Sequence, residues 1–200
     1  MERRINWFGL AAGISILIVL AFSFFIPWWQ LTIGDKLLQV SASPVNTNLG
    51  LLNLNFTVPL IWAWNLVSIL IFVAAGVVML LYSIFPTKSY SKELLSFSYK
   101  KPLYMVISFF IGIIVIVAIA GVFGLSVPAV GKSNIAVPSQ FMPTGFTVSA
   151  LVSAGFQLPF YLAIAAAALC IAARIYHGRV EKLLTANVTA TIPTETAEIS

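Results

Sequence analysis

The sequence predicts an all-α integral membrane protein, a four-transmembrane-helix bundle with a small β-rich extracytoplasmic loop region. Composition is the first reason: the 200 residues are 60% hydrophobic and 8% charged, with a mean hydropathy of +1.01, whereas soluble proteins average about 25% charged residues. The second reason is that four apolar stretches are each long enough to cross a hydrocarbon core of about 30 Å. The third is that basic residues flank these stretches.

The first span is predicted over residues 5–26. A cleavable signal peptide also begins with basic residues, but its apolar region covers only about 7–15 residues. Residues 24–29 are bulky, so they lack the small residues that a cleavage site needs. We therefore expect the segment to be retained as a helix. Gly9 and Gly13 form a GxxxG spacing, which favours close helix packing but also arises by chance in many spans.

Residues 27–58 form the first outer loop, in which apolar and polar residues alternate. The alternation runs through 29–33, 38–42 and 52–58, with Gly34 and Asp35 supplying a turn between the first two runs. We expect an antiparallel sheet of about three half-buried strands on the membrane surface. Its apolar side should face the helix ends or a partner.

The second span is predicted over 59–85, because Pro59 suits the first helical position and Pro86 ends the helix. The short, basic segment 86–102 is then a cytoplasmic loop. The third span, 103–127, has 25 residues without Asp, Glu, Lys, Arg or His and would reach about 37 Å as a helix.

The second outer loop, 128–148, contains three prolines, which disfavour helix and interior strand alike. The fourth span is predicted over 149–175. Pro159 would either kink this helix or divide it into an outer piece and a span that begins near Leu158. The polar tail 183–200 is expected to be disordered.

Charge predicts the orientation. With both termini in the cytoplasm, nine of the 11 Lys and Arg residues lie inside and only Lys36 and Lys132 lie outside, as the positive-inside rule requires. This predicts a multi-pass protein of the cell membrane and no nucleic-acid binding. Asn55 begins the sequon Asn55-Phe56-Thr57 in the first outer loop, so it is a candidate glycosylation site.

The predicted spans lack the groups that most membrane chemistry needs. Apart from Arg174, which marks the cytoplasmic boundary of the fourth span, they contain no charged side chain. Proton pumps and ion-coupled carriers, in contrast, keep ionisable residues within the membrane. His177 and Cys170 are the only histidine and cysteine, so no metal site or cofactor is expected. No paired carboxylate, phosphate-binding loop or nucleophile with its base is recognisable, so we do not expect an enzyme.

Two polar residues, Asn65 and Gln157, lie toward the outer ends of their spans. They can act as hydrogen-bonding contacts between helices, each contributing about 1 kcal/mol. Alternatively, they line a shallow polar pocket for a neutral or amphipathic molecule such as a quinone or a lipid headgroup.

Two classes of function remain. The first is a non-enzymatic accessory or assembly subunit, or a scaffold, that contacts other membrane subunits or a second copy of itself. The apolar residues Trp28, Trp29, Phe141 and Met142 of the outer loops are the candidate partner surface. The second class is a small oligomeric transporter or channel for a neutral or lipid-like solute, or a quinone-binding subunit.

Overall fold

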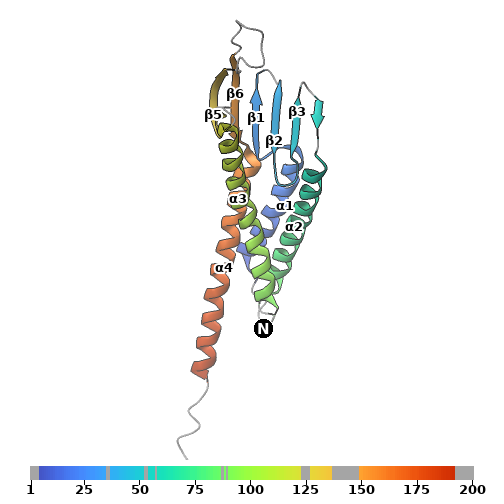
Figure 1. The fold of residues 1–200 in the computed structure, drawn as a ribbon. Coiled ribbons are helices and arrows are strands. Elements are labelled where there is room, and N and C mark those ends of the chain that lie inside the picture. Colours follow the sequence, from blue (N-terminus) through green and yellow to red (C-terminus); the bar gives the residue numbers. More distant parts are fainter. Residues whose placement is uncertain are drawn as a thin grey trace, which may run out of the picture.

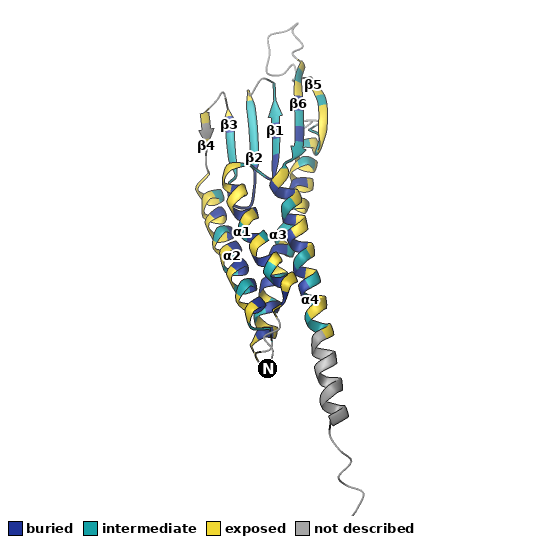
Figure 2. Cartoon of the chain, turned by 180° about the vertical axis from the view of Figure 1, so that it is seen from behind, coloured by how far each residue is buried: buried dark blue, intermediate teal, exposed yellow. Residues whose placement is uncertain are grey.

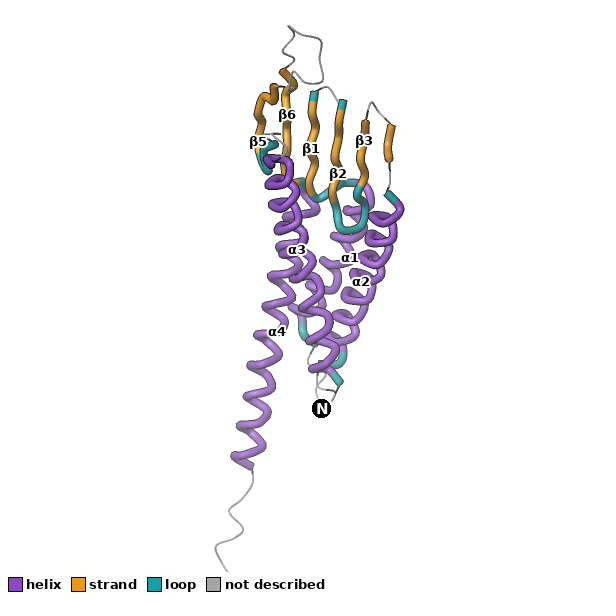
Figure 3. The backbone as a smooth tube through the Cα atoms, in the orientation of Figure 1, coloured by secondary structure: helices purple, strands orange, loops and turns teal. Residues whose placement is uncertain are grey.

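A computed structural model describes residues 5–34, 37–51, 54–56, 58–86, 88, 90–122, 127–136 and 149–191, with residues 55, 135, 136 and 180–191 described by their backbone alone. Helices occupy one end of the molecule and a sheet the other (Figure 1, Figure 3). The described helices include four that are long and apolar enough to cross a membrane. The predicted combination of four apolar helices and a small antiparallel sheet is thus confirmed.

The four helices are α1 (Trp7–Phe25), α2 (Pro59–Ile84), α3 (Ser91–Val122) and α4 (Leu158–Thr191). Helix α1 packs between α2 and α4, and α3 contacts the same two helices. Buried residues concentrate inside this bundle and at the base of the sheet (Figure 2). Helix α3 is the least covered of the four. Only 6% of its most apolar 18-residue stretch is buried inside the protein, against 39% of the corresponding stretch in each of the other three helices.

Helices α1 and α2 approach closely at their glycines. A Cβ added at Gly13 would lie 2.8 Å from Leu80 Cδ2 and 3.2 Å from the carbonyl oxygen of Gly76. A Cβ at Gly9 would lie within 3.2 Å of Tyr82 Cε1 and closer still to Ser83 Oγ. The GxxxG spacing of α1 therefore faces α2, where small residues let the two backbones approach.

Six strands form one antiparallel sheet in the order β4-β3-β2-β1-β6-β5. The strands are β1 (Trp29–Ile33), β2 (Leu38–Ala42), β3 (Asn48–Leu51), β4 (Leu54–Phe56), β5 (Gly131–Ala136) and β6 (Ser149–Phe156). The first loop contributes β1 to β4 and the second contributes β5 and β6, so the pairing of β1 with β6 joins the two loops. The sequence predicted about three strands, whereas the described residues form six.

Three strands were not predicted: β3 lies in the first loop, and β5 and β6 lie in the second. Strand β5 runs between Pro128 and Pro138 without a proline of its own, so the prolines limit it without preventing it. Strand β6 occupies residues that we predicted as the start of the fourth span. In β6, Val152 and Ala154 are buried and alternate with Ser153 and Gly155, which is the pattern of a strand. The fourth helix therefore begins at Leu158, next to Pro159 in its first turn.

Two further boundaries differ from the prediction. Helix α3 begins at Ser91 and contains Pro102, so most of the predicted cytoplasmic loop is helical. Its first turns pack on α2, because Leu95 is buried and the Ser98 hydroxyl lies 3.6 Å from Met79 Sδ. Helix α4 continues to Thr191, so residues 183–191 of the predicted disordered tail are helical. Extending an existing helix avoids the cost of nucleation, and Pro193 follows where the described helix ends.

The α1–α2 contact yields a test. Replacing Gly13 with valine should destabilise the protein by about 1–3 kcal/mol, because the new side chain meets Leu80 and the backbone of Gly76. The matched control is Gly112→Val in α3, where an added Cβ meets nothing within 4 Å. The midpoint of thermal unfolding in detergent measures both, and equal shifts for the two variants would contradict the close approach.

Candidate functional site

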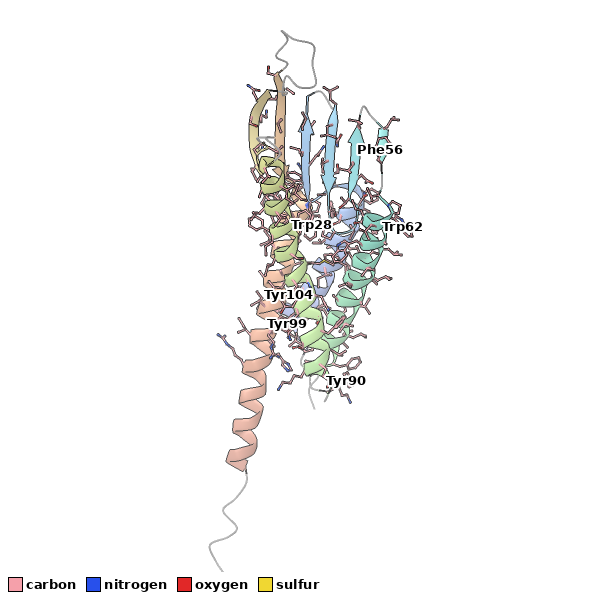
Figure 4. The ribbon with its side chains drawn as sticks, in the orientation of Figure 1. Trp28, Phe56, Trp62, Tyr90, Tyr99 and Tyr104 are labelled. Carbon is pink, nitrogen blue, oxygen red and sulfur yellow. The ribbon has the colours of Figure 1, made fainter. Side chains whose placement is uncertain are left out.

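The junction between the helices and the sheet is built around Trp28, which is 0% exposed. Its indole ring contacts Phe72 of α2, Phe109 of α3 and Phe160 of α4 with centroid separations of 6.1, 5.1 and 6.0 Å. The Nε1 group donates to Ser23 Oγ of α1 at 2.7 Å. One side chain therefore contacts all four helices, at the place that Figure 4 labels.

The backbone of Trp28 also holds the sheet. Its N–H donates to the carbonyl of Ala42 at the end of β2 (3.0 Å), and its carbonyl accepts from Gln157 N–H just after β6 (2.9 Å). Both bonds lie at the base of the sheet, next to the helices. Since Trp28 immediately precedes β1, three neighbouring strands are tied to the same point of the bundle.

Trp29 is 1% exposed and donates from Nε1 to the carbonyl of Ala129 at 2.7 Å. The prediction that Trp28 and Trp29 form an outer partner surface was therefore wrong, since the protein's own core buries both indoles. Two large aromatic residues in an outer loop indicated a need for burial, and the chain meets that need itself. Phe141 and Met142, which belong to the same prediction, lie outside the described residues.

The sheet has one apolar and one polar face. Residues that pair across neighbouring strands point to the same side, and the register gives an apolar row of Ala154, Leu31, Val40, Leu49 and Phe56. A second apolar row contains Val152, Ile33, Leu38, Leu51 and Leu54. The opposite face carries Gln30, Ser41 and Asn48 in one row and Lys132, Ser153, Thr32, Gln39 and Gly50 in another.

Helix α3 covers only part of the apolar face. Phe109, Ile113 and Val117, spaced four residues apart on one side of α3, pack on a cluster from β1, β2 and β6. That cluster contains Trp29, Leu31, Ala42, Val152 and Ala154. The cluster contains no residue of β3 or β4.

The remaining part of the apolar face is exposed. Leu51, Leu54 and Phe56, which we call the edge patch, are 49%, 63% and 51% exposed. Figure 4 places Phe56 on the last strand of the sheet, away from the bundle axis. The edge patch continues the apolar face that α3 covers on the neighbouring strands. It therefore has the composition of a buried sheet surface, but it is exposed in this chain. It is the candidate functional site.

Asn65 and Gln157 are not brought together by any hydrogen bond of the described residues. With its amide oriented to satisfy both groups, Asn65 donates to the carbonyl of Pro44 at 3.3 Å and accepts from the N–H of Thr47 at 3.0 Å. It thereby holds the β2–β3 connection against α2. An open hollow of about 560 Å³ adjoins Asn65, but its lining is mostly apolar and includes Leu60, Ile61, Trp64 and Val67.

Gln157 makes two hydrogen bonds through its backbone. Its N–H donates to the carbonyl of Trp28, and its carbonyl accepts from the N–H of Phe160. Asn55 lies on β4 opposite Gly50, whereas Thr57 of its sequon lies outside the described residues.

One important residue escaped the sequence analysis. Asn6 is 1% exposed at the far end of the bundle, where its Nδ2 donates to Tyr82 Oη of α2 (2.8 Å) and to the carbonyl of Ala173 in α4 (3.3 Å). Its Oδ1 caps α1 by accepting from Gly9 N–H at 3.1 Å. An asparagine immediately before an apolar helix is a typical N-cap, and this signal could have identified it.

The described residues contain no group of three or more His, Cys, Asp or Glu side chains that could hold a metal ion. Comparison with protein-family models, curated proteins and solved structures finds no match to this chain.

The junction yields the second test. Trp28→Ala should cost about 3–5 kcal/mol, because it leaves a cavity among Phe72, Phe109 and Phe160. The control is Trp62→Ala, since Trp62 is 60% exposed at the start of α2. Thermal unfolding in detergent should show a large loss for the first variant and a small one for the second. Similar losses would contradict the role given to Trp28.

Proposed function

We propose that this chain is a non-enzymatic multi-pass membrane protein that serves as an assembly subunit or scaffold. It binds another membrane protein chain through the edge patch of its sheet. The observation that carries the proposal is the half-covered apolar face, whose exposed part continues a face that is buried on β1, β2 and β6.

The charges support an orientation with the sheet outside the cell. The basic residues lie away from the sheet, except for Lys132 on β5: Lys88 lies between α2 and α3, Lys92, Lys100 and Lys101 lie in the first part of α3, and Arg174 and Arg179 lie in the part of α4 remote from its start at the sheet. Basic residues favour the cytoplasmic side. Helix α1 begins at this same end, since Asn6 just before it donates its N–H to the carbonyl of Ser83 near the end of α2. This placement supports an orientation with both termini inside and the sheet outside.

An exposed apolar side chain has a different meaning on the helices than on the sheet. Apolar side chains on the helices, such as Ile111 and Ile114 of α3, face lipid and need no protein partner. The edge patch lies beyond the helix ends, on the strands, where water is the alternative to a partner. A contiguous apolar surface in water is typical of a protein–protein interface.

The interior of the bundle supports a packing role. Among the described residues, every buried side-chain nitrogen or oxygen has a hydrogen-bond partner. The polar groups between the helices are therefore engaged in structure, as Asn6 and Ser23 illustrate. Trp28 and its aromatic neighbours fill the bundle where it meets the sheet.

Native mass spectrometry after mild detergent extraction tests the proposal. The wild-type chain should appear in an assembly of fixed composition, and the double variant Leu54→Glu, Phe56→Glu should appear as the free chain. Burying two carboxylates at an apolar interface costs far more free energy than the apolar contact of the edge patch contributes. The thermal midpoint of the free chain should be unchanged, because both side chains are exposed.

The matched control is Gln39→Glu, Ser41→Glu, which places the same two charges two residues apart on one strand, on the polar face of the same sheet. It should leave the assembly intact. A wild-type chain that is free under these conditions, or equal loss in both double variants, would overturn the proposal. Solute flux through liposomes that contain only this chain would favour a transporter instead.

A further inference from the structure

We propose that a hollow on helix α3 binds one anionic phospholipid at the membrane boundary remote from the sheet. This hollow, which we call the lysine hollow, has a volume of about 380 Å³ and is lined by Glu93, Ser96, Phe97, Lys100, Lys101 and Tyr104. It lies on a different element from the edge patch, so the inference goes beyond the proposed function. It requires only that the bundle lies in the membrane.

The residues of the lysine hollow form one stripe along α3. Their spacing alternates between three residues and one, which places them on one side of a helix over about three turns. All of them except Ser96 are exposed. The opposite side of the same turns carries the buried residues Leu95, Ser98 and Pro102. The hollow therefore opens to the surroundings of the bundle and is not part of its core.

The first charged residues on α3 and α4 mark the level of the hollow in the membrane. Helix α3 has no charged residue after Lys101, and α4 has none before Arg174. The two helices reach this level together, because Cζ of Arg174 lies 5.8 Å from the centroid of the Tyr99 ring on α3. Figure 4 labels Tyr99 and Tyr104 at this level of α3. Basic side chains at the end of an apolar stretch reach the lipid headgroups. The hollow thus lies where hydrocarbon meets headgroups, on the side that the proposed orientation makes cytoplasmic.

The positive charges of the hollow fit a phosphate group. Lys100 and Lys101 are adjacent in the chain and both line the hollow. Lys101 Nζ lies 5.6 Å from the centroid of the Phe97 ring, so its ammonium group is placed beside the aromatic wall. Arg174 adds a third positive charge next to Tyr99. Basic pockets on the cytoplasmic side of transmembrane helices bind anionic phospholipid headgroups in this way.

Glu93 bears on the choice of headgroup. It lies about two turns further from the apolar part of α3 than Lys100 does, on the water side of a phosphate held by the lysines. A carboxylate at that place accepts a hydrogen bond from a headgroup hydroxyl and repels a second negative charge. A phosphodiester whose alcohol carries free hydroxyl groups satisfies both the lysines and Glu93. Phosphatidylglycerol has this chemistry.

The same side of α3 continues as an apolar surface for the acyl chains. Beyond Tyr104, the stripe contains Ile107, Ile111 and Val115, all of which are exposed. Their spacing of four residues keeps them in line with the hollow. A phospholipid can therefore place its phosphate on the lysines and its chains along the helix. A free phosphate compound would lack the second contact, so the site is assigned to a lipid.

Native mass spectrometry with lipid titration tests the inference. The purified chain in mild detergent is titrated with dioleoyl phosphatidylglycerol or dioleoyl phosphatidylcholine, and the fraction that carries one lipid is measured. Phosphatidylglycerol should bind about 5- to 30-fold more tightly, because each lysine near the phosphate adds to the attraction. Lys100→Gln, Lys101→Gln should remove this preference. Lys100→Arg, Lys101→Arg should retain it, because arginine keeps the positive charge.

The matched control is Lys88→Gln, Lys92→Gln. It removes two positive charges from the same end of the molecule, but neither residue lines the hollow. The control should keep the preference for phosphatidylglycerol. Lys100 and Lys101 are exposed, so the thermal midpoint of their glutamine variant should equal that of the wild type.

Four outcomes would overturn the inference. Equal affinity of the wild type for the two lipids would show no headgroup recognition, and equal loss in both glutamine variants would show only diffuse attraction. Tighter binding of dioleoyl phosphatidylethanolamine than of phosphatidylglycerol would overturn the anionic headgroup. Displacement of the bound lipid by glycerol phosphate at the same concentration would show a site for a soluble phosphate compound. None of these results involves the edge patch, so the proposed function would stand.

Discussion

The structure depends on the burial of Trp28 where four helices meet a sheet. Its ring contacts three aromatic residues from α2, α3 and α4, its Nε1 group bonds to Ser23 of α1, and its backbone bonds to the chain at the ends of β2 and β6. A buried aromatic side chain with a satisfied polar group contributes large contact area in one orientation. Removing it would leave the sheet joined to the bundle mainly by chain connections and by the contact with α3.

Because the sheet is attached rigidly to the bundle, the position of its apolar face is fixed relative to the helices. If the sheet could rotate, its apolar face could turn toward lipid or fold back on the helices. Helix α3 and the backbone of Trp28 instead fix that face, so α3 covers β1, β2 and β6 and leaves β3 and β4 open. The edge patch is thus a result of the way the bundle and the sheet are joined. The proposed role as an assembly subunit follows from the edge patch, because the uncovered part of the apolar face is suited to a partner.

Long-range geometry limited what the sequence could predict. Four apolar helices followed from length and hydropathy, and the strands at Trp29–Ile33 and Leu38–Ala42 followed from alternation, because these are local signals. Strand β6 was missed because its alternating residues run directly into the alanine-rich helix, where a continuous apolar stretch is ambiguous. The helical start of α3 was missed because basic residues and Pro102 resembled a loop.

The candidate site was the least predictable part. The sequence indicates that Trp28 and Trp29 need burial, but which surface buries them depends on residues more than 70 positions away, such as Phe109 and Ala129. Likewise, alternation places Leu54 and Phe56 on an apolar face, but only the position of α3 decides which part of that face stays open. Asn6 was locally recognisable as an N-cap, whereas its bonds to Tyr82 and Ala173 were not.

The central claim is that lipid surrounds the bundle and that the junction at Trp28 holds the sheet outside the cell. Cysteine labelling with a membrane-impermeant maleimide in intact cells tests it most directly, with Cys170→Ser as background. We expect Gln39→Cys on β2 to react in intact cells and Lys88→Cys, between α2 and α3, to react only after permeabilisation. Reaction of Lys88→Cys in intact cells, or protection of Gln39→Cys until permeabilisation, would contradict the account.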